Sequence, residues 1–190
     1  SFSLTASSSR EFNLYCQQFF LDNVMRGGLP LSLETHEGKV IFYVFSRKHG
    51  DPERDYNKFV LSPTYLSQGN GSFRDVNQNR RNDVWFNPDV KDSNIVSFFN
   101  LVQADGFNPL VIKGTSFVID DPENLDEILN SYVEDKDKKR VKELLKRPFV
   151  PGELLLFIEE NDINLKTTPK EFFKKVLTHC HKIDNAEHGE

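Results

Sequence analysis

The sequence predicts a mainly α-helical fold with a strand or two. Apolar residues recur at helical spacing in several windows, first at Phe12, Tyr15, Cys16 and Phe19. Cap-forming residues precede several of these windows, as expected at helix starts. Residues 39–46 are instead β-branched and aromatic, which indicates a buried strand. The prediction is therefore a helical protein with a short β element.

The first helix and the segment after it are predicted from caps and breakers. Ser8 and Glu11 have capping-box spacing. The apolar pattern continues to Met25, and two glycines and a proline at 26–30 end it. Residues 47–93 show no helical period. Such long irregular segments are uncommon within a domain and often carry function.

The second half predicts plain amphipathic helices. Asp121 caps a helix that starts with Pro122, and residues 168–171 form a capping box for another. A charged helix is predicted near 135–147, and a short apolar one after Pro151. The apolar stripes expected to face the core are Ile95, Phe98, Phe99 and Val102, then Leu125, Ile128, Leu129 and Tyr132, and finally Phe172, Val176 and Cys180.

Composition and charge narrow the function classes. The 24 basic and 29 acidic residues give a net charge of -5, which disfavours nucleic acid and anionic membranes as partners. No apolar run approaches the roughly 20 residues of a membrane span. The two cysteines, Cys16 and Cys180, suggest no disulfide framework. We therefore expect a cytoplasmic protein with reduced thiols.

The chain is expected to be an excised piece of a longer protein, because it lacks an initiator methionine and ends in a charged run. Its partners would then include the remaining domains of the parent chain. A boundary is predicted near Gly114, where irregular aromatic-rich sequence gives way to amphipathic helices. This divides the chain into residues 1–114 and residues 115–190.

The histidines near the end of the chain do not predict a metal site. His179, Cys180, His181 and His188 are close in sequence. On a helix, however, residues 179 and 181 point to different faces, unlike the i, i+4 pairs of zinc helices. We expect neither a metal nor a cofactor.

The most unusual segment is GSFRDVNQNRRNDVWF, residues 71–86. Between Arg74 and Asp83, nine of ten residues carry an amide, carboxylate or guanidinium group, and Trp85, the one tryptophan, follows at once. Phosphate is disfavoured because Asp75 and Asp83 would repel it. These polar groups do match sugar hydroxyls, and an aromatic ring can cover the C–H face of a sugar. Composition alone leaves open a surface loop, a polyol site and a structural polar network.

A family resemblance favours the sugar interpretation. Residues 71–80, GSFRDVNQNR, resemble the Gly-x-Phe-Arg-Asp-Ser-Asn-Gln-Asp element of cellobiose phosphorylases and related inverting glycoside phosphorylases. FLDNVMRGGLP (20–30) and LVQADGFNPLV (101–111) resemble the segments that flank this element. The resemblance covers about residues 11–114. It implies the N-terminal part of a six-hairpin catalytic domain, a partial (α/α)6 toroid, with residues 115–184 as a helical insertion.

The resemblance also implies roles for individual residues. In that family the element grips the sugar at the mouth of the toroid, which makes Arg74 and Asp75 sugar ligands here. Asn77 and Gln78 would support them. The family's last aspartate is Asn79 in this chain, so an acceptor-only carboxylate has become an amide. We therefore expect a sugar preference that differs from the family's, or a site that has drifted.

The expected function follows from these roles. The parent would cleave or phosphorolyse glycosidic bonds of a disaccharide or oligosaccharide, with inorganic phosphate as co-substrate if it is a phosphorylase. The family's general acid and phosphate-binding histidine belong to later motifs, so this chain is expected to hold a sugar-binding wall without activity of its own. The alternative is a non-catalytic carbohydrate-binding or structural interaction module.

Overall fold

The computed structural model corrects the predicted fold class. It describes residues 5–44, 64–78, 80 and 83–188, and only the backbone of residues 20–27. The described chain is 45% helical and 21% strand, with three small antiparallel sheets, so the fold is mixed α/β. The prediction of a mainly α-helical (α/α)6 toroid is therefore wrong.

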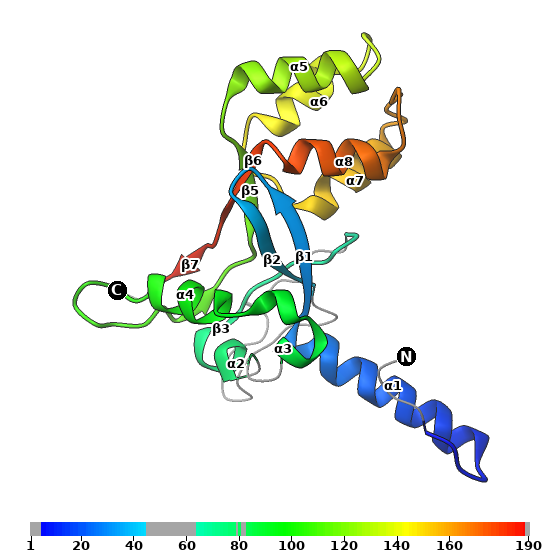
Figure 1. Cartoon of the computed structure of the whole chain (residues 1–190), viewed down its shortest axis with the longest axis vertical. Coiled ribbons are helices and arrows are strands. Elements are labelled where there is room, and N and C mark those ends of the chain that lie inside the picture. Colours follow the sequence, from blue (N-terminus) through cyan, green and yellow to red (C-terminus); the bar gives the residue numbers. More distant parts are fainter. Residues whose placement is uncertain (1–4, 45–63, 79, 81–82, 189–190) are drawn as a thin grey trace.

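Helices and strands are mixed along the chain (Figure 1). Their bounds are α1 (Arg10–Gly27), β1 (Leu29–Thr35), β2 (Gly38–Val44), β3 (Gly71–Ser72), α2 (Phe73–Gln78), α3 (Asp83–Phe86), the 3-10 helix η3 (Pro88–Val90), α4 (Ser93–Asn100), β4 (Val111–Ile112), β5 (Ser116–Ile119), α5 (Pro122–Tyr132), α6 (Lys138–Leu145), α7 (Pro151–Glu160), α8 (Pro169–Leu177), β6 (Cys180–Ile183) and β7 (Ala186–Glu187).

The first helix forms as predicted, although its cap is one residue later. The N–H of Phe12 donates to Ser9 Oγ at 3.1 Å, and Ser9 thereby takes the capping role expected of Ser8. Figure 1 shows α1 extending away from the rest of the molecule. Its aromatic residues Phe12, Tyr15 and Phe19 remain largely exposed, so this predicted apolar face of the helix does not pack into a core.

A two-faced hairpin, β1–β2, lies at the centre of the molecule. Its strands pair antiparallel around a turn at Gly38, which has a φ of 97°. Leu31 faces Phe42 across the hairpin, and both pack into the main core. Because side chains alternate along a strand, Ser32 and Tyr43 point to the opposite face. The hairpin thus separates an apolar side from a polar side.

The other two sheets join the end of the chain to its middle. β5 pairs with β6, with Ile119 opposite Cys180 and Ser116 opposite Ile183. β4 pairs with β3 on one side and with β7 on the other. Cys180 was predicted on the last helix, but α8 ends at Leu177, so Cys180 begins a strand instead. The boundary predicted near Gly114 remains a prediction.

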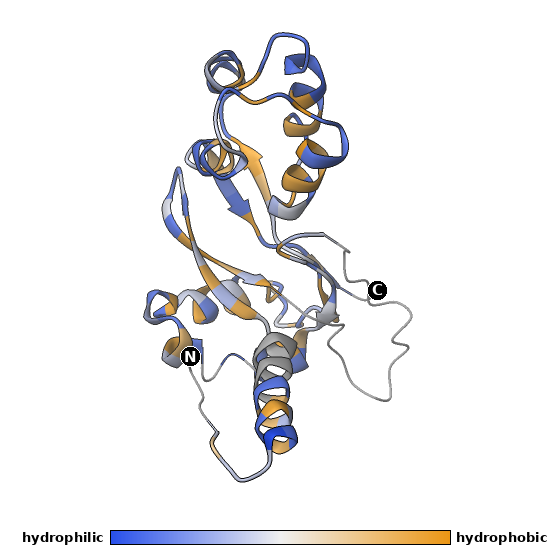
Figure 2. Cartoon of the chain, turned by 90° about the vertical axis from the view of Figure 1, so that its right-hand side faces the viewer, coloured by the Kyte–Doolittle hydropathy of each residue, from blue (hydrophilic) through white to orange (hydrophobic). Residues whose placement is uncertain are grey.

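The main core lies on the apolar side of the hairpin. Helices α5 to α8 cover it, and Figure 2 shows apolar residues along the strands and on the helix sides that face them. The predicted stripe of α5 is confirmed at Leu125, Ile128 and Leu129. The capping box of α8 is also confirmed, because Thr168 Oγ1 accepts from the N–H of Glu171.

Helix α4 buries less than its sequence predicts. Phe98 is buried beside Phe73, with ring centroids 5.3 Å apart. Ile95 and Phe99, from the same predicted stripe, are exposed. The stripe thus matches helical spacing but meets a core of only three buried residues, Phe73, Val76 and Phe98, among those that the structure describes.

The toroid fails for a physical reason. Its helices would have to pair as hairpins around a ring, whereas here strands separate α1 from α2 and α4 from α5. Leu29, Leu31 and Leu33 alternate with polar or turn-forming residues, a period-2 pattern that forms β1.

Within the described ranges, no helix is both long enough and apolar enough to cross a membrane.

Candidate functional site

The polar stretch predicted as a sugar wall divides into an outward part and an inward part. Phe73 and Val76 are buried on one side of α2, one helical turn apart. Arg74, Asn77 and Gln78 are exposed, and their i, i+3, i+4 spacing places them on one outward face. Three of the predicted sugar-binding residues therefore share a surface.

Asp75 lies at the side of this surface. Arg74 Nε lies 3.1 Å from Asp75 Oδ1, and the two side chains are 63% and 15% exposed. The guanidinium is therefore open to solvent while the carboxylate is mostly covered. The structure brings this predicted pair together as neighbours.

Trp85, the predicted aromatic ligand, is on the short helix α3. Its side chain is the most exposed of the large hydrophobic residues in the described chain, at 80%. A side chain this exposed contributes no packing to a core. Asn79, the last predicted sugar-binding residue, lies outside the described residues, so its prediction stays untested.

The inward part of the stretch forms a buried ion pair. Arg80 Nη1 lies 3.5 Å from Asp83 Oδ2, and the side chains are only 4% and 5% exposed. The Arg80 guanidinium carbon lies 4.0 Å from the ring centroid of Tyr43, in the geometry of a cation–π contact. This part of the stretch is a structural polar network, the alternative that composition left open.

Tyr43, Asp83 and Asn94 form a hydrogen-bonded cluster beside this ion pair. The Tyr43 hydroxyl lies 2.7 Å from both Asp83 Oδ2 and Asn94 Oδ1, and it can donate to only one of them. Asn94 Nδ2 also donates to Asp83 Oδ2, at 3.0 Å. Burial raises the pKa of Asp83 above its ordinary value, although Arg80 and the hydrogen bonds from Tyr43 and Asn94 oppose this. The hydrogen bonds from Tyr43 and Asn94 therefore favour the charged form of Asp83.

The hairpin positions this network. Ser32 Oγ and Lys39 Nζ each donate to Asp89 Oδ2 at 2.9 Å, and Asn87 Nδ2 donates to Ser32 Oγ at the same distance. The bond from Lys39 lowers the pKa of Asp89. These hydrogen bonds hold the segment from α3 to α4 against the polar face of the hairpin, and Val90 of η3 is buried in the same segment.

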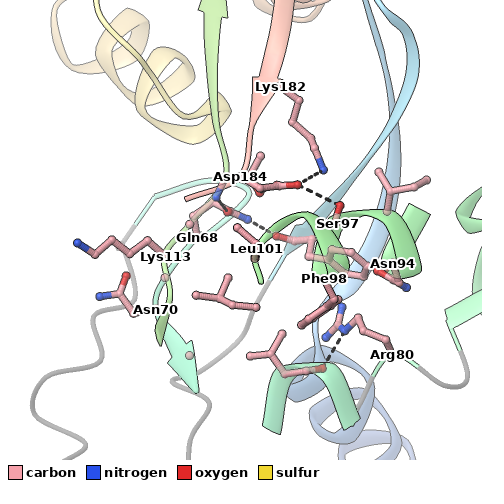
Figure 3. A pocket seen from close by; sticks show the side chains of 18 residues that line it. Gln68, Asn70, Arg80, Asn94, Ser97, Phe98, Leu101, Lys113, Lys182 and Asp184 are labelled. Atoms are coloured by element: carbon pink, nitrogen blue, oxygen red, sulfur yellow. Dashed lines mark hydrogen bonds and ion pairs between the residues drawn. The ribbon is translucent and has the colours of Figure 1, made fainter. Parts of the chain in front are cut away.

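A cavity of about 70 Å³ lies behind α2. Figure 3 shows Asp184 with Lys182 and Ser97 on one side of it and Arg80 on the other. The lining comes from strands, helices and loops that are far apart in sequence. Its residues are Ile41, Tyr43, Gln68, Gly69, Asn70, Gly71, Val76, Arg80, Asn94, Ser97, Phe98, Leu101, Ile112, Lys113, Gly114, Thr115, Lys182 and Asp184.

Asp184 is the centre of the hydrogen bonds on that side of the cavity. Thr115 Oγ1 donates to its Oδ1 at 2.9 Å, and Ser97 Oγ donates to its Oδ2 at 3.0 Å. Lys182 Nζ lies 2.9 Å from Oδ2. Gln68 accepts from the N–H of Thr115 at 2.8 Å and donates to the carbonyl of Tyr43, which fixes its amide.

Sequence reasoning did not single out these lining residues. Ser97 and Asn94 lie on a helix that was predicted from its apolar stripe, and Asp184 is the last residue of the segment predicted as a helical insertion. The one available signal was Gln68 to Gly71, a polar glycine-containing run directly before the predicted stretch. The pairing of distant strands, which brings Asp184 to this place, leaves no such local signal.

Histidine, cysteine and acidic side chains are the groups that could hold a metal. No cluster of three or more His, Cys, Asp or Glu side chains suited to a metal occurs in the described part of the chain. His181 Nδ1 pairs with Asp120, and His188 contacts the carbonyl of Leu101. Cys180 is buried, which raises the pKa of its thiol to about 12 and makes it a poor nucleophile.

Comparisons with known proteins identify no relative. No protein-family model, curated protein or solved structure matches the chain significantly. The function is therefore inferred from the geometry of the chain and from the motif resemblance.

Proposed function

We propose that this chain contributes a saccharide-binding wall to an enzyme that cleaves or phosphorolyses glycosidic bonds. The observation that carries the proposal is the outward face of α2, where Arg74, Asn77 and Gln78 are exposed together while Phe73 and Val76 are buried. A guanidinium and two amides supply paired donors and acceptors of the kind that vicinal hydroxyls require.

Trp85 supports the same proposal from the next helix. A sugar ring has an apolar C–H face that stacks on an indole. An exposed tryptophan and a face with one guanidinium and two amides suit a saccharide better than they suit a nucleic acid, given the net charge of -5. The wall would recognise a disaccharide or oligosaccharide.

The remaining parts of the proposal concern the parent protein. Other domains would supply the general acid, and inorganic phosphate would be the co-substrate if the reaction is phosphorolysis. We propose the cytoplasm as its compartment, because Cys16 and Cys180 are free and disulfides are rare there.

Trp85 provides a direct test because it is the sole tryptophan of the chain. Its fluorescence should shift to shorter wavelength and saturate when cellobiose or another saccharide covers the indole. Titrations with cellobiose, maltose, glucose and xylose should rank the sugars. Arg74→Ala should weaken the saturable response, whereas Lys139→Ala, on the exposed side of α6, should not. A response that never saturates with any sugar would refute the proposal.

A second function is favoured by a different surface. Phe12, Leu14, Tyr15 and Phe19 are each more than half exposed on α1. A non-catalytic interaction module would use such a helix to bind a partner domain. In that case sedimentation analysis should show an assembly that Tyr15→Ser and Phe19→Ser disrupt, and the Trp85 titration should show no saccharide binding.

A further inference from the structure

The geometry points to a second binding site, distinct from the outward face of α2: the cavity behind α2 binds a small neutral polyol of about the size of glycerol. This inference goes beyond the saccharide wall and does not depend on it. Three features of the cavity support it: its size, its two kinds of lining and the balance of its charges.

The volume sets the size of the ligand. A water molecule needs roughly 10–15 Å³ of cavity volume on the same measure. The cavity of about 70 Å³ therefore holds about five waters, or a three-carbon polyol in their place. Pockets for larger ligands hold about 300–1,000 Å³. A disaccharide belongs elsewhere.

One side of the lining suits hydroxyl groups. Ser97 and Thr115 each donate their hydroxyl proton to Asp184. Their hydroxyl oxygens can then only accept a hydrogen bond from a ligand. Asn94 and Gln68 each use one amide N–H within the protein, and an amide nitrogen carries two. Donors and acceptors are thus fixed in place by bonds among themselves.

The other side of the lining suits carbon. Ile41, Val76, Phe98, Leu101 and Ile112 contribute apolar side chains to the same cavity. Water alone would leave this side without favourable contacts, because apolar cavity surface does not hydrogen-bond. A molecule with hydroxyls along one edge and C–H groups along the other satisfies both sides.

The charges of the lining are already balanced. Arg80 pairs with Asp83, Lys182 with Asp184, and Lys113 with Glu187 at 3.0 Å. An anionic ligand would approach the carboxylate of Asp184 and would compete with existing partners for every cation. A neutral ligand avoids both costs. The cavity therefore selects against charged analogues of the same size.

The test uses the whole chain and three probes: glycerol, sorbitol and glycerate. Saturation-transfer NMR should show saturable glycerol binding with a Kd on the order of 1–10 mM, as expected for so small a ligand. Sorbitol, with twice as many carbons, and glycerate, with a carboxylate, should bind at least about 10-fold more weakly. Equal binding of all three, or no saturable glycerol signal, would overturn the inference.

Two variants place the ligand in the cavity. Thr115→Val keeps the side-chain shape and removes the hydroxyl, and Ser97→Ala removes the other hydroxyl on Asp184. Each should weaken glycerol binding by about 2- to 10-fold, the range for a neutral hydrogen bond. Thr178→Val, which alters a hydroxyl at the end of α8, is the matched control. Circular dichroism checks that each variant is folded.

A crossed comparison separates this site from the saccharide wall. Arg74→Ala and Trp85→Ala should leave glycerol binding unchanged, because neither residue lines the cavity. Thr115→Val should leave the Trp85 response to saccharides unchanged. Glycerol binding that is insensitive to both cavity variants would mean that it occurs elsewhere, and the inference would be wrong.

Discussion

The two faces of the β1–β2 hairpin support regions held together by different forces. On one face, nineteen of the described residues form a continuous apolar core with helices α5 to α8. On the other face, the segment from α2 to α4 has a cluster of three buried residues and depends on Arg80, Asp83 and their hydrogen bonds. The first region is stabilised mainly by apolar burial, whose free energy is roughly proportional to the buried area. The second region is stabilised by hydrogen bonds and an ion pair, which require specific distances and angles.

This difference in core size indicates which region can carry binding groups. A region with a small core can expose polar groups such as Arg74 and enclose a cavity, because few side chains are needed to fill it. We expect such a region to have low local stability, which is usual for binding sites. The predictions below test whether the two faces differ in this way.

The largest effect is expected from Phe172→Ala in the main core. Phe172 is fully buried, and truncation should cost about 3–5 kcal/mol of unfolding free energy through lost transfer energy and a cavity. Phe73→Ala, its counterpart in the small cluster, should cost less because fewer apolar side chains surround it. Urea denaturation measures both. An equal or larger loss for Phe73→Ala would contradict the comparison.

Two glycine substitutions compare close packing in the two regions. A Cβ at Gly152 would lie 1.7 Å from the carbonyl oxygen of Tyr65, so Gly152→Ala must displace backbone and should cost about 1–3 kcal/mol. A Cβ at Gly114 would lie 3.2 Å from side-chain atoms of Gln68, so that side chain would have to shift by only a few tenths of an ångström. Gly114→Ala should therefore lower the Tm less. The reverse order would indicate that the polar region is the more rigid.

Tyr43→Phe tests the polar network and its dependence on pH. The change removes a donor from buried Asp83 and should cost about 1–3 kcal/mol at pH 7. The pKa of Asp83 is raised in the folded state, so the stability of its protonated form is complete below the ordinary aspartate pKa and is lost as pH rises through the raised value. The hydrogen bond from Tyr43 favours the charged form of Asp83, so Tyr43→Phe lowers the unfolding free energy mainly when Asp83 is charged.

The difference in stability between wild type and Tyr43→Phe should therefore shrink as the pH falls from 7 through the raised pKa of Asp83. Chemical denaturation at several pH values measures this difference. Tyr65→Phe, whose hydroxyl bonds Glu159 at the surface, is the control and should cost much less at every pH. A difference that grows towards acid pH would exclude the network described.

The smallest effect on stability is expected from Arg74→Ala. The Arg74 side chain is 63% exposed, so the unfolding free energy should change by no more than about 0.5 kcal/mol. Saccharide binding should nevertheless fall about 10- to 150-fold, from the loss of one charge-assisted hydrogen bond. A loss of stability without a loss of binding would show that Arg74 is structural.

Much of the helical region could be predicted from local patterns. The helix after Asp121 has a cap, a proline at its first position and an apolar stripe, and each of these is confirmed. These signals operate within a few residues, so the sequence around them is sufficient. The second strand of the hairpin, β2, coincides with the strand predicted at 39–46. The first strand was not predicted, because the breakers at 26–30 hid the alternation of Leu29, Leu31 and Leu33.

The sequence spacing of Arg74, Asn77 and Gln78 places them on one surface once α2 forms. The helix itself was not predicted, because residues 47–93 show no helical period. Only the tertiary structure decided that Arg80 and Asp83 turn inward, since their burial depends on Tyr43 and Asn94. It also decided that Asp184 meets Ser97 and Thr115. Such sites depend on strand pairing between distant segments, and pairing is chosen by the burial of whole faces rather than by the residues that the site employs.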